Sequence, residues 1–311
     1  MKSDVIRKLK AQQSASLQEL LQAVRSARER VAGRITAAAT KQNIATSFKS
    51  REALFRQVGG YYGKLGADID AWAQGMTRKV ALSWHGQANT DIQAGTDAGA
   101  VIKFDPERIK TYWQMIHPDN SQYLAATFTQ QMTKEDIASL RQSFVETFRK
   151  SSIEGLTHQE INKALQSKWN EVAGSIASDR FTDRAGRTWD NARYMQMLVR
   201  TTTTRIARES YIDTLVAHGD DLMRIVNVME SCELCEAWDG VIISVSGANS
   251  DYPSYQDALD AGWAHPQCDC QLERVDETLD KEDIARQADT ENPKDWADVD
   301  QVAEYKLRFA A

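Results

Sequence analysis

The residues best suited to chemistry are the four cysteines, which all lie between positions 232 and 270. They form a Cys-x-x-Cys pair that is followed further along the chain by a His-Pro-Gln-Cys-Asp-Cys run. Two thiolates three residues apart on a tight turn can converge on one tetrahedral metal ion, and a second Cys or His group completes such a site. The spacing therefore predicts a structural zinc site with the candidate ligands Cys232, Cys235, His265, Cys268 and Cys270.

These five candidates compete for four coordination positions. Cys268 and Cys270 would point to the same face of an extended segment, but they are more widely separated than in a knuckle, so one could ligate while His265 takes the fourth position. Two other states of the cysteines are open at this stage. They could be thiols in a reducing cytoplasm, or they could form disulfides between the first pair and the second.

No catalytic pattern accompanies the cysteines. The five histidines are dispersed, and neither H-E-x-x-H nor G-x-S-x-G occurs. A zinc deaminase would need Pro before its Cys-x-x-Cys, where Ser231 stands, and an H-x-E nearby, whereas His158-Gln-Glu160 lies far upstream. The segment GGYYGK fails as a phosphate-binding loop because Val58 occupies the position of the first glycine. We therefore predict no catalytic residues.

The composition is that of a globular protein. With 311 residues, of which 42% are hydrophobic, the chain can bury a sizeable core, which excludes overall disorder. A net charge of −6 excludes a uniformly basic nucleic-acid coat. No apolar run approaches the roughly 18 residues that a membrane span needs, and the first residues lack the apolar core of a signal peptide. We expect a soluble protein made in a cytoplasm, with no membrane partner.

Helical periodicity dominates the first two thirds of the chain, and only five prolines occur. The expected helices begin at a capping-box-like Thr133 with Asp136 and at a capping box of Thr157 with Glu160, and one ends at Gly219. A loop is expected over about 171–187. The full set of expected helices is 3–35, 50–95, 105–117, one from 133, one from 157, and 189–217.

The helix at 189–217 contains Arg-Thr-Thr-Thr-Thr-Arg at 200–205, although β-branched residues lower helix propensity. Such a threonine face either packs closely against a sheet or presents polar groups to a partner, and we favour close packing. Beyond Gly219 the residues at 222–229 and 241–245 have strand character, and Asp239-Gly240 is a turn dipeptide. A hairpin with the first cysteine pair near its tip is the simplest arrangement.

Charge is distributed unevenly. Residues 1–50 hold ten Lys or Arg against three acids, whereas residues 271–311 hold twelve acids against six bases. Both ends can be solvated helical faces, and the tail can hold helices at 279–289 and 294–308. The basic front could instead contact DNA or an acidic partner surface.

An ordered set of motifs resembles a known family. It runs from the Arg-Thr helix through Cys-x-x-Cys-x-x-Trp-Asp-Gly, Ser-x-Ser-Gly at 244–247 and Tyr252-Pro253 to His-Pro-x-Cys-x-Cys. Over about residues 190–275 this set is similar to the C-terminal domain of phage head morphogenesis proteins, in the Mu-F-like and phage minor capsid protein 2 groups. Relatives often place Arg between the last two cysteines, where Asp269 stands here.

The resemblance implies a minor structural protein of a tailed-phage virion, located at the portal vertex or the capsid interior. Its partners would be the portal protein and capsid or scaffold proteins, with packaged DNA as a partner for residues 1–50. It would assist head assembly, DNA packaging or DNA delivery. The alternatives are a zinc-dependent enzyme or toxin-like module, and a zinc-containing nucleic-acid-binding protein; acidic residues around the cysteines disfavour the latter.

The sequence thus predicts a mostly α protein in three parts. An elongated helical region occupies residues 1–180, and a small α+β domain with the zinc-knuckle-like Cys/His cluster occupies residues 187–275. An acidic tail follows over residues 276–311.

Overall fold

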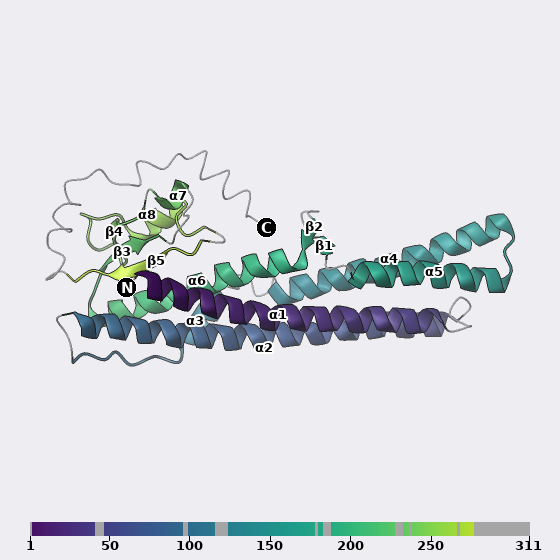
Figure 1. Cartoon of the computed structure of the whole chain (residues 1–311), viewed down its shortest axis with the longest axis horizontal. Helices are drawn as coiled ribbons and strands as arrows, with labels where there is room; N and C mark the ends of the chain where they lie inside the picture. Colours follow the sequence, from purple (N-terminus) through teal and green to yellow (C-terminus); the bar gives the residue numbers. More distant parts are fainter. Residues whose placement is uncertain are drawn as a thin grey trace. The chain divides into compact units, whose positions relative to one another are not determined.

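The structure is a computed structural model (Figure 1). Of the predicted features, the tail beyond Asp276, with its two helices, and Cys232 lie outside the described residues. The residues described are 2–40, 47–95, 99–115, 124–177, 180–182, 188–227, 233–236, 238–265 and 268–276.

The described chain is mostly helical, which confirms the predicted fold class. The glycines of the second helix do not interrupt it, because a helix interior accepts glycine at a cost of about 1 kcal/mol each. Among the helices that can be described, none combines the length and the apolarity that crossing a bilayer requires. The helices are α1 (Lys2–Ala39), α2 (Phe48–Ala94), α3 (Arg108–Met115), α4 (Leu124–Glu154), α5 (His158–Ala177), α6 (Asn191–His218), α7 (Glu233–Glu236) and α8 (Tyr255–Asp260).

Strands form two small antiparallel sheets. β1 (Arg180–Thr182) pairs with β2 (Thr188–Asp190), and β3 (Leu222–Val226) lies between β4 (Ile242–Ser244) and β5 (Gln271–Arg274). The pairing of β3 with β4 confirms the predicted hairpin. The sequence did not predict β5, because its residues are largely polar and become a strand by pairing with β3.

The chain divides into two compact units, each assembled from separated segments. Residues of α1 and α2 contribute to both units. The division of the chain near residues 180 and 187 follows sequence motifs and stays a prediction. The first unit contains Met1–Ser16, Gln74–Ile116 and Gln196–Ala310, and the second contains Leu17–Ala73 and His117–Met195.

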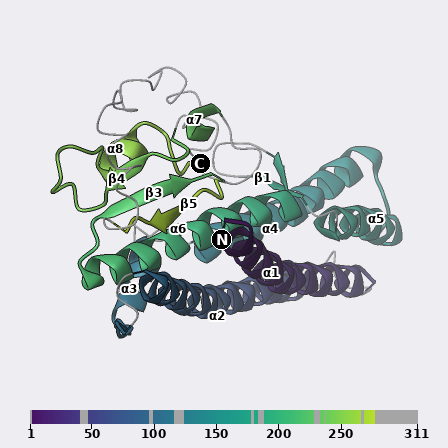
Figure 2. The ribbon, with the colours of Figure 1, turned by 60° about the vertical axis from the view of Figure 1, so that its left-hand side comes forward.

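The second unit is built from helices. α4 and α5 form a hairpin and lie side by side in both views (Figures 1 and 2). α2 runs antiparallel to α4, since Tyr62 bonds to Asp136 while the earlier Arg51 lies over the later Phe144, 4.0 Å from its ring centre. Apolar residues at every third or fourth position of α5 fill the interior, including Leu165 with no exposed surface.

Arg28 of α1 belongs to the interior of the second unit. It is 5% exposed, and its Nε donates to the carbonyl of Ile176 at 2.5 Å. This carbonyl lies in the last turn of α5, where helical acceptors lack intrahelical partners and a positive charge is favourable. The basic front is therefore not one solvated face, although Arg25, Arg30 and Arg34 are exposed.

The first unit places α6 along the sheet of β3, β4 and β5 (Figure 2). Thr203 and Thr204 are completely buried, and the Thr203 hydroxyl returns to the Val199 carbonyl at 2.7 Å. This agrees with the close-packing interpretation of the threonine run. On the α2 side, Ser210 donates to the Ala81 carbonyl at 2.7 Å, so small hydroxyls allow the two helices to approach closely.

Local signals set several helix ends. Thr157 and Glu160 form the predicted capping box, with the Thr157 amide donating to Glu160 at 2.8 Å. Gly219 ends α6 with a positive φ of 108°, and Asp220 N–H reaches back to the Leu215 carbonyl at 3.0 Å. These ends follow from backbone requirements that are visible in the sequence.

Two local predictions were wrong. Thr133 and Asp136 lie inside α4, where the Thr133 hydroxyl bonds to the Thr129 carbonyl and the Asp136 carboxylate is used by Tyr62. The loop expected at 171–187 is shorter, because α5 continues to Ala177 through buried Ala173 and Ile176, and β1 follows. In both cases packing against other helices extends the helix beyond its local signals.

Candidate metal centre

Three cysteines of the first unit come from two separated segments. Cys235 lies in α7, in the connection between β3 and β4, and Cys268 and Cys270 lie in the extended segment that enters β5. Asn227, directly after β3, fixes the position of Cys235 in α7, because its side-chain amide donates a hydrogen bond to the Cys235 carbonyl. Because β5 pairs with β3, both cysteine segments are brought to the same end of the sheet.

The three sulfur atoms are close enough to hold a metal ion. They lie within 4.8 Å of one another, and the Sγ atoms of Cys235 and Cys268 are 3.6 Å apart. Thiolates about 2.3 Å from a tetrahedral zinc ion have sulfurs about 3.8 Å apart, so this spacing fits zinc. The same spacing is too long for the S–S bond of about 2.05 Å, which argues against a disulfide between these two residues.

The cysteine cluster is closed to solvent. Cys235, Cys268 and Cys270 are 1%, 5% and 3% exposed. Neighbouring Trp238 and Trp263 are each 1% exposed and contribute large apolar surfaces to the same domain. A buried site without open solvent access suits a structural metal ion rather than a catalytic one, which needs a free coordination position.

The thiol groups of Cys235 and Cys268 are hydrogen-bonded to each other. A hydrogen bond to Cys268 raises the pKa of the Cys235 thiol, and the same bond lowers the pKa of Cys268. The Cys270 amide donates to the Cys268 sulfur at 3.3 Å, and the charge of Arg208 also lowers the Cys268 pKa. Negative charge is therefore favoured at Cys268, whereas Cys235 keeps its proton until a metal ion displaces it.

The structure assembles part of the predicted ligand set. Cys235, Cys268 and Cys270 come together, whereas Cys232 lies outside the described residues. His265 contributes its backbone carbonyl, which accepts the Cys268 N–H at 3.0 Å, and its ring is not part of the three-cysteine group. The identity of the ligands stays a prediction.

Asp269, between the two late cysteines, has a structural role that the sequence did not reveal. Its carboxylate is 6% exposed and accepts Arg200 Nη2 at 2.6 Å and Gln13 Nε2 at 3.0 Å. Gln13 also donates to Thr204 at 3.1 Å. In extended backbone, Asp269 points away from its two cysteine neighbours, so it ties the segment to α6 and α1.

Arg208 completes this contact from α6. It is 4% exposed, and its Nη1 donates to the Cys270 carbonyl at 3.2 Å. Its guanidinium carbon lies 5.0 Å from the centre of the Trp263 ring. Together with Arg200 and Thr204 it follows a four-residue spacing, which puts all three on one face of α6. This spacing is the sequence signal that could have linked the Arg-Thr helix to the cysteines.

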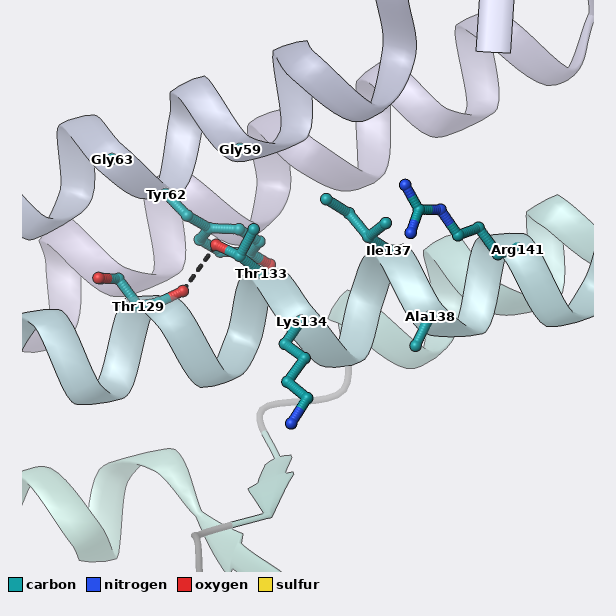
Figure 3. Close-up of a pocket in the computed structure, with 9 residues that line it drawn as sticks. All are labelled: Gly59, Tyr62, Gly63, Thr129, Thr133, Lys134, Ile137, Ala138 and Arg141. Atoms are coloured by element: carbon teal, nitrogen blue, oxygen red, sulfur yellow. Dashed lines mark hydrogen bonds between the residues drawn. The ribbon is translucent and has the colours of Figure 1, made fainter. Parts of the chain in front are cut away.

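The second unit contains a shallow hollow of about 750 Å³ between α2 and α4 (Figure 3). Lys134 extends away from α2, and the Thr133 hydroxyl donates its hydrogen bond to the Thr129 carbonyl within α4. The lining presents no acid and base converging on one point, so it offers no catalytic arrangement. Its lining residues are Gly59, Tyr62, Gly63, Thr129, Thr133, Lys134, Ile137, Ala138 and Arg141.

Comparison with known families adds an independent observation. The family model described as phage minor capsid protein 2 matches residues 50–271. No curated protein matches significantly, and no solved structure does. The predicted extent of the resemblance, about 190–275, was wrong, since the match covers most of the chain. Its N-terminal part consists of amphipathic helices, whose apolar periodicity recurs in many unrelated proteins and carries no distinctive motif.

Proposed function

This chain belongs to the phage minor capsid protein 2 family, and from that premise we propose that it is a structural protein of the phage head. In this role it associates with other head proteins in the virion. More specifically, it binds the portal vertex, in contact with portal and capsid or scaffold proteins. There it assists head assembly, DNA packaging or DNA delivery.

The family match over residues 50–271 carries this proposal. The buried cysteine cluster supports it, because a metal ion held among buried sulfurs stabilises a domain and is shielded from substrate. The protein therefore acts as a structural component of the head and catalyses no reaction. The zinc-dependent enzyme and toxin-like alternatives would need an accessible metal.

The metal we propose is one structural zinc ion per chain. Cys235, Cys268 and Cys270 supply three thiolates, and Cys232 or His265 supplies the fourth ligand. When bound, zinc would cross-link the β3–β4 connection to the segment before β5 and contribute folding free energy locally. The chain's own part is to bury the sulfurs, to fix the segment of Cys268 and Cys270 on α6, and to hold Cys235 through Asn227.

A contact with packaged DNA through residues 1–50 is the remaining part of the proposal. Arg25, Arg30 and Arg34 are exposed and can meet phosphates, whereas Arg28 is used inside the second unit. Binding through such exposed cations would weaken steeply as salt rises. The alternative of a zinc-containing nucleic-acid-binding protein remains disfavoured by the acidic residues around the cysteines.

The test is assembly of phage that lack this protein. Particles should form heads but lose infectivity or DNA content, and rescue should need stoichiometric protein during assembly. Deleting residues 222–275 should remove rescue. Glu236→Gln is the matched control, since Glu236 is an exposed acid next to Cys235 and should rescue fully. Loss of rescue in folded, incorporated Glu236→Gln particles would favour the enzyme alternative.

A further inference from the structure

Arg208 is a buried cation beside the cysteine cluster. It is 4% exposed, and its described hydrogen bond joins Nη1 to the Cys270 carbonyl, a neutral acceptor. Its Nε is buried and has no hydrogen-bond partner. One face of the guanidinium is covered by the Trp263 ring at 5.0 Å. Water is therefore largely excluded from this charge.

No carboxylate forms an ion pair with Arg208 among the residues that the structure describes. Asp269, the nearest acid in the cysteine segment, pairs with Arg200 at 2.6 Å. Glu209 follows Arg208 on α6 and lies within reach of its charge, but it forms no ion pair with Arg208: its carboxylate accepts the Tyr255 hydroxyl at 3.1 Å, and burial raises the pKa of this carboxyl group, which disfavours its charged form. A buried charge without a counter-charge costs several kcal/mol, so proteins rarely keep one uncompensated.

The cysteines can supply the missing negative charge. Neutral thiols or disulfides would leave the guanidinium without an ion-pair partner among the described residues, with only the charge of Glu209 nearby. Three thiolates with one divalent cation carry one net negative charge, and a fourth thiolate makes it two. The position of Arg208 therefore discriminates among the three states that the sequence left open, and it favours the metal–thiolate state.

We propose that Arg208 is the fixed counter-charge of an anionic metal–thiolate centre formed by Cys235, Cys268 and Cys270. The proposal rests on the metal site proposed above and adds a residue to it. Arg208 is a positioning residue: its bond to the Cys270 carbonyl and its stacking on Trp263 hold the charge between α6 and the ligand segment. Removing the charge should weaken metal binding even where all cysteines remain.

The experiment measures Co²⁺ binding to the full-length, reduced protein through the thiolate-to-cobalt charge-transfer absorption. Arg208→Met should lower the cobalt affinity by about 10- to 100-fold. Arg208→Lys, which retains the charge, should recover most of the affinity. Arg205→Met is the matched control, because it removes an exposed charge from the same helix and should leave cobalt affinity unchanged.

Equal cobalt affinity in the wild type, Arg208→Met and Arg208→Lys would overturn the role of Arg208 while leaving the metal site intact. Absence of the thiolate absorption in the wild type would overturn both the metal site and the counter-charge. If Arg208→Met does not fold, Arg208→Gln carries the same comparison, since it keeps a donor for the Cys270 carbonyl without the charge. An unchanged affinity in Arg208→Gln would likewise overturn the proposal.

Discussion

At the scale of single residues, the second unit has a polar pair in its interior. Tyr62 is completely buried, and its hydroxyl donates to the carboxylate of Asp136, which is 9% exposed. Burial raises the pKa of Asp136 to about 6, although the bond from Tyr62 and the charge of Arg28 oppose the rise. Between about pH 4 and pH 6, the folded state therefore keeps a proton on this carboxyl group, whereas the unfolded chain, with the ordinary pKa of 3.8, releases it.

This shift predicts a pH-dependent stability. Because the folded pKa lies above the unfolded one, the stabilisation from protonated Asp136 is complete below about pH 4 and is lost as pH rises through 6. The change is about 3 kcal/mol at most, from about 1.4 kcal/mol per pKa unit. Asp136→Asn, which can still accept the Tyr62 bond, should flatten that part of the profile.

Urea unfolding of both proteins between pH 4 and 7.5 measures the effect. The stability difference between Asp136→Asn and wild type should grow in favour of the variant as pH rises. The difference in unfolding free energy between the two proteins cancels the pH dependence of the other acidic groups, which both chains share. A difference that stays constant with pH would contradict the assignment of a raised pKa to Asp136.

At the scale of elements, the hairpin of α4 and α5 depends on its turn. Gly155 has a positive φ of 66°, and Leu156 N–H bonds to the Ser151 carbonyl at 3.2 Å, which ends α4 in a Schellman arrangement. The capping box of Thr157 and Glu160 then starts α5. Gly155 and Leu156 therefore end α4, and the capping box that follows directly begins α5.

Two glycine-to-alanine substitutions should have opposite effects. A Cβ at Gly155 meets no atom within 4 Å, so Gly155→Ala should destabilise by backbone strain alone, about 1 kcal/mol. Gly174 lies within α5, also has open space, and has no positive φ, so Gly174→Ala should stabilise by about 0.5–1 kcal/mol. Thermal unfolding compares them, and a shift of the same sign for both would refute the argument.

At the scale of the whole molecule, metal removal should act on one unit. The cysteine segments belong to the first unit, while α4 and α5 belong to the second. Stripping zinc, or Cys235→Ser, should therefore speed hydrogen exchange at the amides of β3 and β5, because structural zinc supplies folding free energy locally. The amides of α4 and α5 should keep their protection.

Mass spectrometry of exchanged peptides can separate the two regions. The internal control is His218→Gln, which alters a histidine that bonds to Asp220 in the same unit and lies outside the cysteine group. Its exchange in β3 and β5 should respond to chelation as the wild type does. Uniform loss of protection across α4, α5 and the sheet would show instead that zinc stabilises the whole chain.

Much of this architecture was predictable because its causes are local. Apolar residues at helical spacing predicted α1, α2 and α6, and the capping box of Thr157 and the glycine at 219 set helix ends. Such signals depend on backbone requirements within a few residues. The same locality explains the failure at Thr133, where a capping pattern lies inside a longer helix.

The cysteine cluster's residue types, the helical character of the chain and the pairing of β3 with β4 could all be predicted from the amino-acid sequence alone. The three-dimensional packing was needed to show that Cys235 meets Cys268 and Cys270, and that Asp269 and Arg208 attach this segment to α6. The physical reason is sequence distance. Contacts between segments that are far apart along the chain depend on packing of the whole unit, and that packing follows no single local pattern.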